Sequence, residues 1–425
     1  MKLRIIAVVA LAAFVVASGR AAELRTRDLH LQLAVDDLGG PALSVPGVFV
    51  SAGRAGNWRV AGLRAELDQP MAGGLRMTWT VEAALEGTLF RLGAHLQNQG
   101  AQPARIDTFR SWSTGWEVAG GVRRLQSWDA LTFQRHDRDL APGQSHRLGS
   151  RLHSSEEKGA NPYWVIEGAS GRLHFALEWC GGWEAEISGG SGKLRFVVRL
   201  PAEETQLVLG PGEEIQGPAL WVAATRHMEE ALARDQWMDW RSAVRRSVFP
   251  SPPAAYPLIY NHWYALRFDL NAEALRRQLS AAPAYGFDAF VIDAGWYERV
   301  GEWSPGVAKF QSGEFEQFLR SVKLQGLKAG IWTCPQFIGG EASHRPAEAD
   351  LPGLYSKFLG GYLLPMRVVH ENLPGHVDLL RRRYSADWWK YDQALFTADT
   401  RGGVMRNVVA FQDALREVRR RNPDL

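Results

Sequence analysis

The chain has 425 residues, enough for two or more domains that each bury a full hydrophobic core. Its net charge of +3 excludes a strongly basic surface, so we expect no nucleic-acid partner. With only Cys180 and Cys334, a disulfide framework is excluded as well. The 17 tryptophans are many, and tryptophans can stack on sugar rings, although core packing is their commoner use.

Residues 1–22 predict a secretion signal. Lys2 and Arg4 precede an apolar run from Ile5 to Val16, and Gly19-Arg20-Ala21 provides a small-x-small cleavage site. This run is too short to cross a bilayer as a helix, and no later stretch is long and apolar enough. We therefore expect an exported protein, periplasmic or extracellular, without a membrane span.

Residues 23–224 predict a large antiparallel β-sandwich. Apolar and polar residues alternate over 75–81, 90–96 and 194–200, with glycine-rich turns between such segments and no helical period. Asn161–Tyr163 and Trp179–Trp183 resemble loops. They are either turns with core aromatic residues or, for the second, a tryptophan-bearing loop over a sugar site in the next domain.

Residues 225–254 predict a linker, because a helical period up to Val248 is followed by Pro250-Ser251-Pro252-Pro253.

Residues 255–425 predict strands that alternate with helices. The expected strands are 258–260, 289–292, 328–333 and 387–393. One expected helix starts at residue 271, and three others span 314–325, 376–385 and 407–421. Four such units in a row require a parallel sheet, in a barrel or in a doubly wound sheet. Polar and aromatic residues gather just past each strand, at the edge where these folds build active sites.

Lys390 and Asp392, at the end of the last expected strand, predict a reactive carboxylate. Residues two apart on a strand share a face, so Lys390 is expected to keep Asp392 ionised and able to act as a nucleophile. The plainer alternative is an ordinary ion pair or a helix-capping aspartate. Asp293 and Glu302 are the other carboxylates near strand ends.

The sequence has no Ser-His-Asp order, no zinc-type spacing and no phosphate-binding motif, so we expect neither a metal nor a cofactor. Carboxylates beside tryptophans point to carbohydrate chemistry. Two carboxyl groups about 5 Å apart allow one of them to attack a glycoside.

Five motifs follow one another in the second half of the chain: Asn261-His262-Trp263-Tyr264, Asp293-x-Gly295-Trp296, Gly301-Glu302-Trp303 with Lys309-Phe310, Gly326-Leu327-Lys328-x-Gly330-Ile331-Trp332, and Lys390-x-Asp392. In this order they closely resemble glycoside hydrolase family 36 of clan D, the α-galactosidases or melibiases. Asn161-Pro162-Tyr163 and Pro211-Gly212-Glu213 also fit the family. The resemblance implies an N-terminal antiparallel β-supersandwich, then a (β/α)8 TIM-type barrel of which residues 255–425 form about four βα units, the first half.

The resemblance implies a retaining α-glycosidase acting on terminal α-galactoside-like sugars. Asp392 would be the nucleophile, Lys390 would contact it and the sugar, and Asp293 would bind sugar hydroxyls. The aromatic residues expected to contact the substrate are Trp263, Tyr264, Trp296 and Trp332. The alternatives are a non-catalytic carbohydrate-binding protein and a transglycosylase of raffinose-synthase type. The oligomeric state stays open, a homo-oligomer included.

Three departures from the family pattern stand out: Ala294, Gln336 and Ala394, where the family usually has Asp, Glu and Asn. Ala294 removes one sugar-hydroxyl contact, so arabinopyranose or N-acetylgalactosamine are alternatives to galactose. The family's acid/base aspartate would lie beyond Leu425. We therefore expect an incomplete chain with little turnover of ordinary glycosides.

Overall fold

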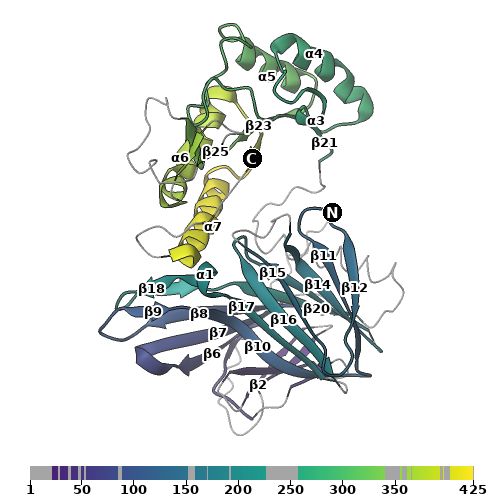
Figure 1. Cartoon of the computed structure of the whole chain (residues 1–425), viewed down its shortest axis with the longest axis vertical. Helices are drawn as coiled ribbons and strands as arrows, with labels where there is room; N and C mark the ends of the chain where they lie inside the picture. The colour runs from purple at the N-terminus through teal and green to yellow at the C-terminus, as the bar shows by residue number, and fades with distance from the viewer. Residues whose placement is uncertain are drawn as a thin grey trace, which may run out of the picture. The chain divides into compact units, whose positions relative to one another are not determined.

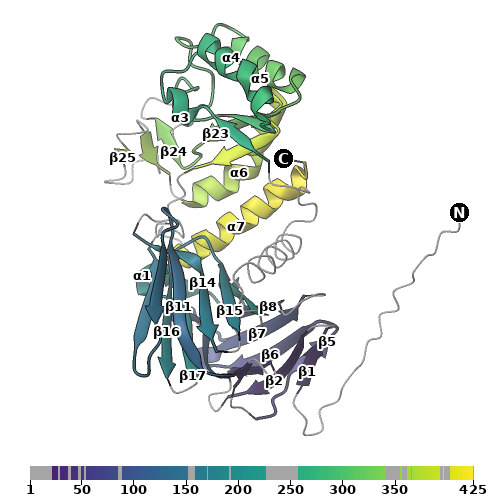
Figure 2. The same cartoon turned by 90° about the vertical axis from the view of Figure 1, so that its right-hand side faces the viewer.

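The chain forms two compact units in the computed structural model (Figures 1 and 2). One comprises Met1–Val244 with Thr400–Arg406, and the other comprises Arg245–Asp399 with Asn407–Leu425. The predicted signal peptide and linker lie almost entirely outside the described residues, so their boundaries stay predictions. The structure describes residues 22–26, 29–36, 40–45, 49–51, 54–84, 89–151, 158–169, 171–190, 193–225, 257–339, 355–356, 361–364, 366–392, 396 and 403–424.

The first unit is β-rich and antiparallel, as the alternating pattern predicts. Its described strands form two large sheets, one of five strands and one of ten. The five-stranded sheet has the order β13 (Ser145–Ser150), β16 (Trp183–Gly190), β17 (Lys193–Leu200), β10 (Phe109–Val118) and β4 (Phe49–Val50). The ten-stranded sheet has the order β12 (Arg135–Asp139), β11 (Val122–Asp129), β14 (Ala160–Gly168), β15 (Arg172–Glu178), β20 (Ala219–Thr225), β8 (Leu89–Asn98), β7 (Leu75–Ala83), β6 (Arg64–Pro70) and β5 (Arg59–Ala61), with β19 (Glu214–Gln216) beside β8.

Smaller elements complete this unit. They are a sheet of β1 (Ala22–Arg25), β2 (His30–Val35) and β3 (Pro41–Ser44), a pair of β9 (Ala104–Ile106) and β18 (Leu207–Leu209), and the short helices η1 (Ala72–Gly74) and α1 (Ala202–Thr205).

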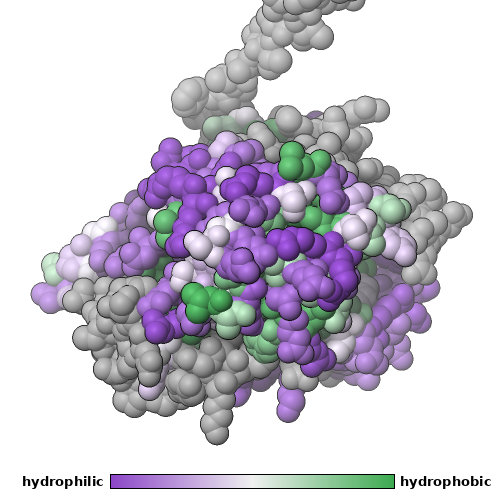
Figure 3. All heavy atoms as spheres, turned by 90° about the horizontal axis from the view of Figure 1, so that it is seen from above, coloured by the Kyte–Doolittle hydropathy of each residue, from purple (hydrophilic) through white to green (hydrophobic). Residues whose placement is uncertain are grey.

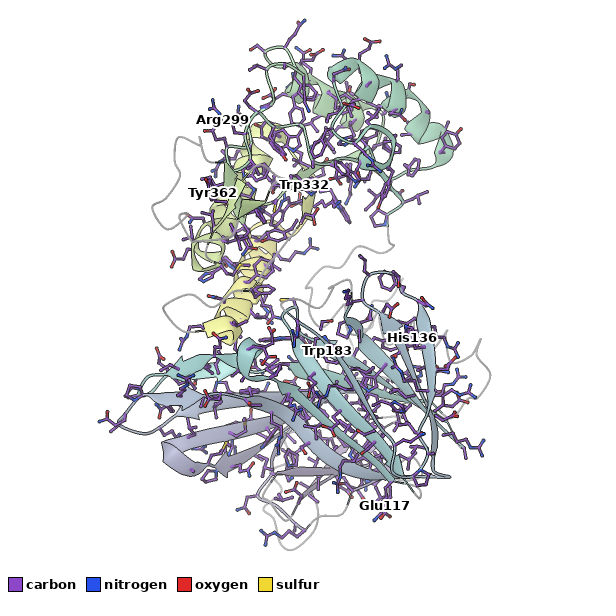
Figure 4. All side chains as sticks on the ribbon, in the orientation of Figure 1. Glu117, His136, Trp183, Arg299, Trp332 and Tyr362 are labelled. Atoms are coloured by element: carbon purple, nitrogen blue, oxygen red, sulfur yellow. The ribbon has the colours of Figure 1, made fainter. Side chains whose placement is uncertain are left out.

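Aromatic side chains join the two large sheets face to face. Trp116 of the five-stranded sheet stacks on Phe175 of the ten-stranded sheet with ring centroids 6.0 Å apart. Trp164 and Trp183 stack across the same gap at 5.7 Å. Trp179 and Trp183 are buried, and Figure 4 shows Trp183 within this unit. These residues are therefore core aromatics, and the alternative of a loop over a sugar site is wrong for them.

The second unit is built on a parallel sheet of four described strands, in the order β21 (Ile259–Asn261), β22 (Ala289–Ile292), β23 (Lys328–Thr333) and β27 (Trp388–Tyr391). The strands lie in chain order, unlike those of a doubly wound sheet, whose order reverses at a switch point. Closure into a (β/α)8 barrel extends beyond these four strands and stays a prediction.

Three helices lie where they are predicted: α4 (Ala272–Ala281), which continues into η2 (Ala282–Tyr285), α5 (Glu314–Leu324) and α7 (Gly403–Arg421). The short helix α3 (Trp263–Leu266) is not predicted, and α6 (Met366–Tyr384) is longer than predicted. Asn271 starts α4, since its side chain accepts a hydrogen bond from the Ala274 amide at 2.9 Å. The apolar face of α5 packs into the core beside Phe290 and Ile331. Helices α4 and α5 lie side by side in both views (Figures 1 and 2).

Two sequence expectations for this unit are wrong. Helix α6 starts at Met366 rather than at His376 and contains Pro374, because Val369 and Leu373 are buried and tertiary packing offsets the cost of the proline. No element is predicted between residues 333 and 376, whereas the structure has a small antiparallel sheet there, formed by β24 (Phe337–Gly339), β26 (Gly361–Leu363) and β25 (Tyr355–Ser356).

The described surface is mainly hydrophilic in the view of Figure 3, with small separate hydrophobic patches. None of the helices in the described part of the chain combines the length and the apolar character needed to cross a membrane.

Candidate active site

The strand register places polar side chains on one face of the sheet at its carboxyl edge. Asn261 pairs with Val291, so Asp293, two residues further on, shares its face. Trp332 pairs with Lys390 across β23 and β27, and alternation puts both on this same face. The predicted site residues of three neighbouring strands therefore converge because of register.

Gly330 permits the close approach of the strands beneath this edge. A Cβ atom at this position would lie 2.6 Å from Val291 Cγ2 and 3.3 Å from Trp388 Cβ. Such a separation from Val291 is too short for carbon atoms, so a side chain at Gly330 would push the strands apart.

Asp293 is a buried, fully engaged carboxylate. Its side chain is 4% exposed, and Oδ2 lies 2.6 Å from Lys390 Nζ. The same oxygen accepts a hydrogen bond from Asn261 Nδ2 at 2.6 Å, and Oδ1 accepts one from the Ala294 amide at 2.7 Å. Because a buried carboxylate needs a counter-charge and hydrogen-bond donors, these three groups explain how Asp293 is accommodated.

His262 holds the backbone of Asp293 from below. Its Nδ1 accepts a hydrogen bond from the Asp293 amide at 2.8 Å, so its Nε2 carries the proton and donates to the Arg267 carbonyl at 3.1 Å. The ring is fully buried, and burial lowers the pKa of His262 below its ordinary value. His262 is therefore a neutral link between the ends of β21 and β22.

Asp392 follows β27 at the same edge and is held differently. It is half-buried, and its Oδ2 accepts a hydrogen bond from Trp332 Nε1 at 2.9 Å. Its backbone amide donates to the Thr333 carbonyl at 3.3 Å. Over the described residues, its other carboxylate oxygen, Oδ1, has no recorded hydrogen bond. Asp392 therefore combines an oriented carboxylate with one available oxygen.

The predicted pairing of Lys390 with Asp392 is wrong. The structure records Lys390 with Asp293, and within its described part it records no Lys390–Asp392 ion pair. Asp293 is the more deeply buried carboxylate and therefore has the greater need of the ammonium group.

Two of the predicted substrate-contacting aromatic residues belong to the core. Trp296 is 0% exposed, stacks on Phe315 and donates from Nε1 to the Trp332 carbonyl at 2.9 Å. Trp332 is 1% exposed, lies inside this unit in Figure 4 and stacks on Tyr297 with centroids 5.9 Å apart. Neither indole face is open to a sugar, so their assignment as contact surfaces is wrong. Trp332 instead orients Asp392 through its N–H.

Trp263 and Tyr264 follow β21 in α3, near the same edge. Trp263 is half-buried and meets Phe268 edge-on at 5.0 Å, whereas Tyr264 is 89% exposed. The structure leaves both accessible, so their role in lining a substrate pocket stays a prediction.

Sequence reasoning missed several residues that organise the site. Asn261 and His262 stood in a noted motif without a role, and only their contacts to Asp293 reveal one. Lys309, also in a noted motif, donates from Nζ to the carbonyls of Phe268 and Gly295 at 2.9 and 2.7 Å and so ties two loops of this edge together.

Cys334 directly follows β23 at this edge. This thiol is buried, and its pKa is raised above the ordinary value by burial first and by the charge of Asp392 second. The thiol is therefore protonated and unreactive. In the described part of the chain, no group of three or more His, Cys, Asp or Glu side chains is placed to hold a metal ion.

Comparison with known proteins identifies relatives of part of this chain. Residues 217–349 match the Melibiase family model. Probable α-galactosidase G of Aspergillus terreus is 24% identical over 271 residues, which cover 58% of this chain and 37% of that protein. α-Galactosidase 1 of Pediococcus pentosaceus is 26% identical over 221 residues, covering 49% of this chain and 30% of that protein. The chain thus spans about a third of the length of these curated relatives.

A solved structure shares the fold over almost the entire chain. A doubly substituted variant of the family 36 α-galactosidase AgaA of Geobacillus stearothermophilus, in complex with stachyose, superposes with a TM-score of 0.69 at 16% identity. The match covers 94% of this chain and 61% of AgaA. At this identity the likeness establishes the fold, and the chemistry depends on the residues at the sheet edge.

Proposed function

We propose that this relative of the family 36 α-galactosidases is a retaining glycoside hydrolase for terminal α-galactosides, with Asp392 as its nucleophile. The proposal depends on one observation: two carboxylates at the same edge of the sheet differ in their burial and in their hydrogen bonds. Asp293 is buried and its oxygens are engaged, whereas Asp392 is half-buried, oriented by Trp332 and has Oδ1 available. The first suits a fixed structural anion and the second suits a nucleophile.

In the proposed reaction, Asp392 Oδ1 attacks the anomeric carbon of the sugar. The C1–O bond to the leaving group breaks, the leaving oxygen takes up a proton from a general acid or from solvent, and a glycosyl ester of Asp392 forms. Water then attacks the same carbon and gives up a proton to solvent or to that group, which releases the sugar and restores the carboxylate, so the anomeric configuration is retained. The Trp332 N–H keeps Oδ2 in place while charge moves through the carboxylate.

Lys390 supplies donors for the sugar. Its ammonium group has three N–H bonds, and in the described structure one of them is used on Asp293. Its side chain is 37% exposed, so the remaining donors can reach a hydroxyl group beside Asp392. Because Lys390 pairs with Asp293, it does not neutralise Asp392, whose negative charge favours the positive charge that develops on the sugar ring.

The substrate class comes from the relatives. The curated relatives are named α-galactosidases, and AgaA was solved with stachyose. In this chain Ala294 is buried, and its amide is used by Asp293, so this residue offers no side-chain contact to a hydroxyl. Arabinopyranosides and N-acetylgalactosaminides therefore belong in the substrate panel beside galactosides.

The test is covalent labelling with a 5-fluoro α-galactosyl fluoride. Fluoride leaves without protonation, so glycosylation does not depend on a general acid, and the ring fluorine slows hydrolysis of the ester. We expect peptide mass spectrometry to find the added sugar on Asp392, and Asp392→Asn to abolish the label. Labelling of another residue, or none, would overturn the proposal. Sugar binding without any label would instead indicate a carbohydrate-binding protein.

Export is the remaining part of the proposal. It is supported by the charged and apolar pattern of residues 1–22 in the sequence. Expression in a bacterial host followed by N-terminal sequencing of the secreted or periplasmic form should show cleavage near Ala21, and an uncleaved cytoplasmic product would count against it.

A further inference from the structure

A partly buried hydrogen-bond chain connects helix α6 to the strand ends that carry Asp392. His376 of α6 places Nε2 at 3.0 Å from Thr333 Oγ1 on β23. The same hydroxyl oxygen lies 2.8 Å from Trp389 Nε1 on β27. One threonine side chain thus joins a helix and two strands.

The chemistry of the three side chains sets the direction of these bonds. An indole N–H can only donate, so Thr333 Oγ1 accepts from Trp389. The hydroxyl keeps its own proton, which it can donate to His376 Nε2 when that ring nitrogen is unprotonated. The surroundings agree with a neutral ring: Trp303 and Trp389 flank His376 at 6.0 and 6.2 Å, and burial lowers its pKa from 6.5 to about 4.

Thr333 also connects Asp392 to β23 through a backbone hydrogen bond. The Thr333 carbonyl accepts the Asp392 amide at 3.3 Å, and the preceding residue, Trp332, donates to the Asp392 carboxylate at 2.9 Å. The side chains of Thr333 and Trp389 occupy the face of the sheet opposite to Trp332 and Lys390, as the register shows. The chain through His376 therefore supports Asp392 from behind and does not enter the sugar-facing side.

We propose that His376 is a positioning residue that, through Thr333, holds Asp392 in the orientation for attack. This inference rests on the proposed function and adds how its nucleophile is aligned. Loss of the acceptor at His376 frees the Thr333 hydroxyl to turn, which loosens the junction of β23 and β27 from which both contacts to Asp392 arise.

We expect the loss of His376 to slow the reaction of Asp392 without weakening the binding of the sugar. Lys390 and Asp293 lie on the other face, so sugar affinity should not depend on His376. Labelling by the 5-fluoro α-galactosyl fluoride yields a maximal rate constant and a half-saturation concentration. We expect His376→Leu to lower the rate constant about ten-fold, the size of one lost hydrogen bond, and to change the half-saturation concentration less than two-fold.

Conservative and paired variants make the test specific. His376→Gln keeps an acceptor near the position of Nε2 and should recover most of the loss. Thr333→Val removes the bond to His376 and also the bond from Trp389, so it should be at least as slow as His376→Leu. The double variant should be no slower than Thr333→Val, because that substitution already removes the link to His376. Thr333→Ser keeps the hydroxyl and should resemble His376→Gln. Asn372→Leu, an exposed change on the same helix, is the matched control and should keep the unchanged rate.

The possible results separate the two proposals. If the unchanged protein is not labelled at Asp392, the proposed function fails and this inference fails with it. If it is labelled and His376→Leu labels at the same rate, only the inference is overturned. The inference would also be overturned if the rate losses of the single variants multiplied in the double variant. The same holds if His376→Leu raised the half-saturation concentration and left the maximal rate constant unchanged.

Discussion

Lys390 reaches across the sheet to Asp293, at the end of β22, and leaves Asp392, at the end of its own strand, to the indole N–H of Trp332. The 2.6 Å ion pair places the positive charge beside the most deeply buried carboxylate of the edge. A neutral donor is sufficient for Asp392, which is half-buried and solvated in part. Because the two carboxylates have different partners, Asp293 is held in place while one oxygen of Asp392 stays available to a substrate.

Trp332→Phe should slow covalent labelling of Asp392 by a factor of about 10 to 100. The substitution keeps an aromatic ring against Tyr297 and removes the one hydrogen bond that the structure records to Asp392 Oδ2, and bonds to charged groups are worth about 1.5–3 kcal/mol. Labelling rates followed by intact-protein mass spectrometry would measure it. Trp112→Phe, an equally buried change in the β-rich unit, is the control, and equal slowing in both variants would contradict the assigned role.

Lys390→Met should destabilise the edge locally, because Asp293 loses its counter-charge while it remains buried. We expect the free energy of opening of β22 and β27 to fall by about 2 kcal/mol, measured as faster amide hydrogen exchange in peptides from these strands. Adding Asp293→Asn should restore part of the loss. Lys328→Met, an exposed lysine on β23, should leave the exchange unchanged. An equal effect of the two lysine substitutions would exclude a specific Lys390–Asp293 contribution.

Acid should destabilise the protein through His376. Its pKa is about 4 in the folded chain and 6.5 ordinarily, so between these values the unfolded chain binds the proton and the folded chain does not. Stability from this group is therefore complete above pH 6.5 and falls as the pH drops toward 4, by about 3 kcal/mol in total. Urea unfolding across this range should show a correspondingly smaller loss in His376→Gln. Parallel curves for the two proteins would contradict this assignment.

Gly330→Ala should destabilise the α/β unit by about 1–3 kcal/mol, because the new methyl group would lie 2.6 Å from Val291 Cγ2. Pulse proteolysis in urea, with the fragments of each unit followed separately, would detect the shift. Gly115→Ala on β10 is the matched control, since a Cβ there meets no atom within 4 Å. Equal unfolding of the two variants would show that the strand spacing tolerates a side chain.

The sequence by itself determined the elements that depend on local spacing. The two-residue alternation located β7, β8 and β17, and the helical period located α4 and α5. It also determined which residues stand at the ends of the four parallel strands, since a strand end is a local feature. Asp293, Lys390 and Asp392 stand at such strand ends.

Only the tertiary structure decided which of these residues touch. Lys390 and Asp293 are 97 positions apart, and their contact depends on strand order and register, which no local pattern encodes. The same holds for the burial of Trp296 and for the reach of His376 to Thr333. Short-range periodicity specifies the direction in which a side chain points, whereas its partner is set by the packing of elements distant in the chain.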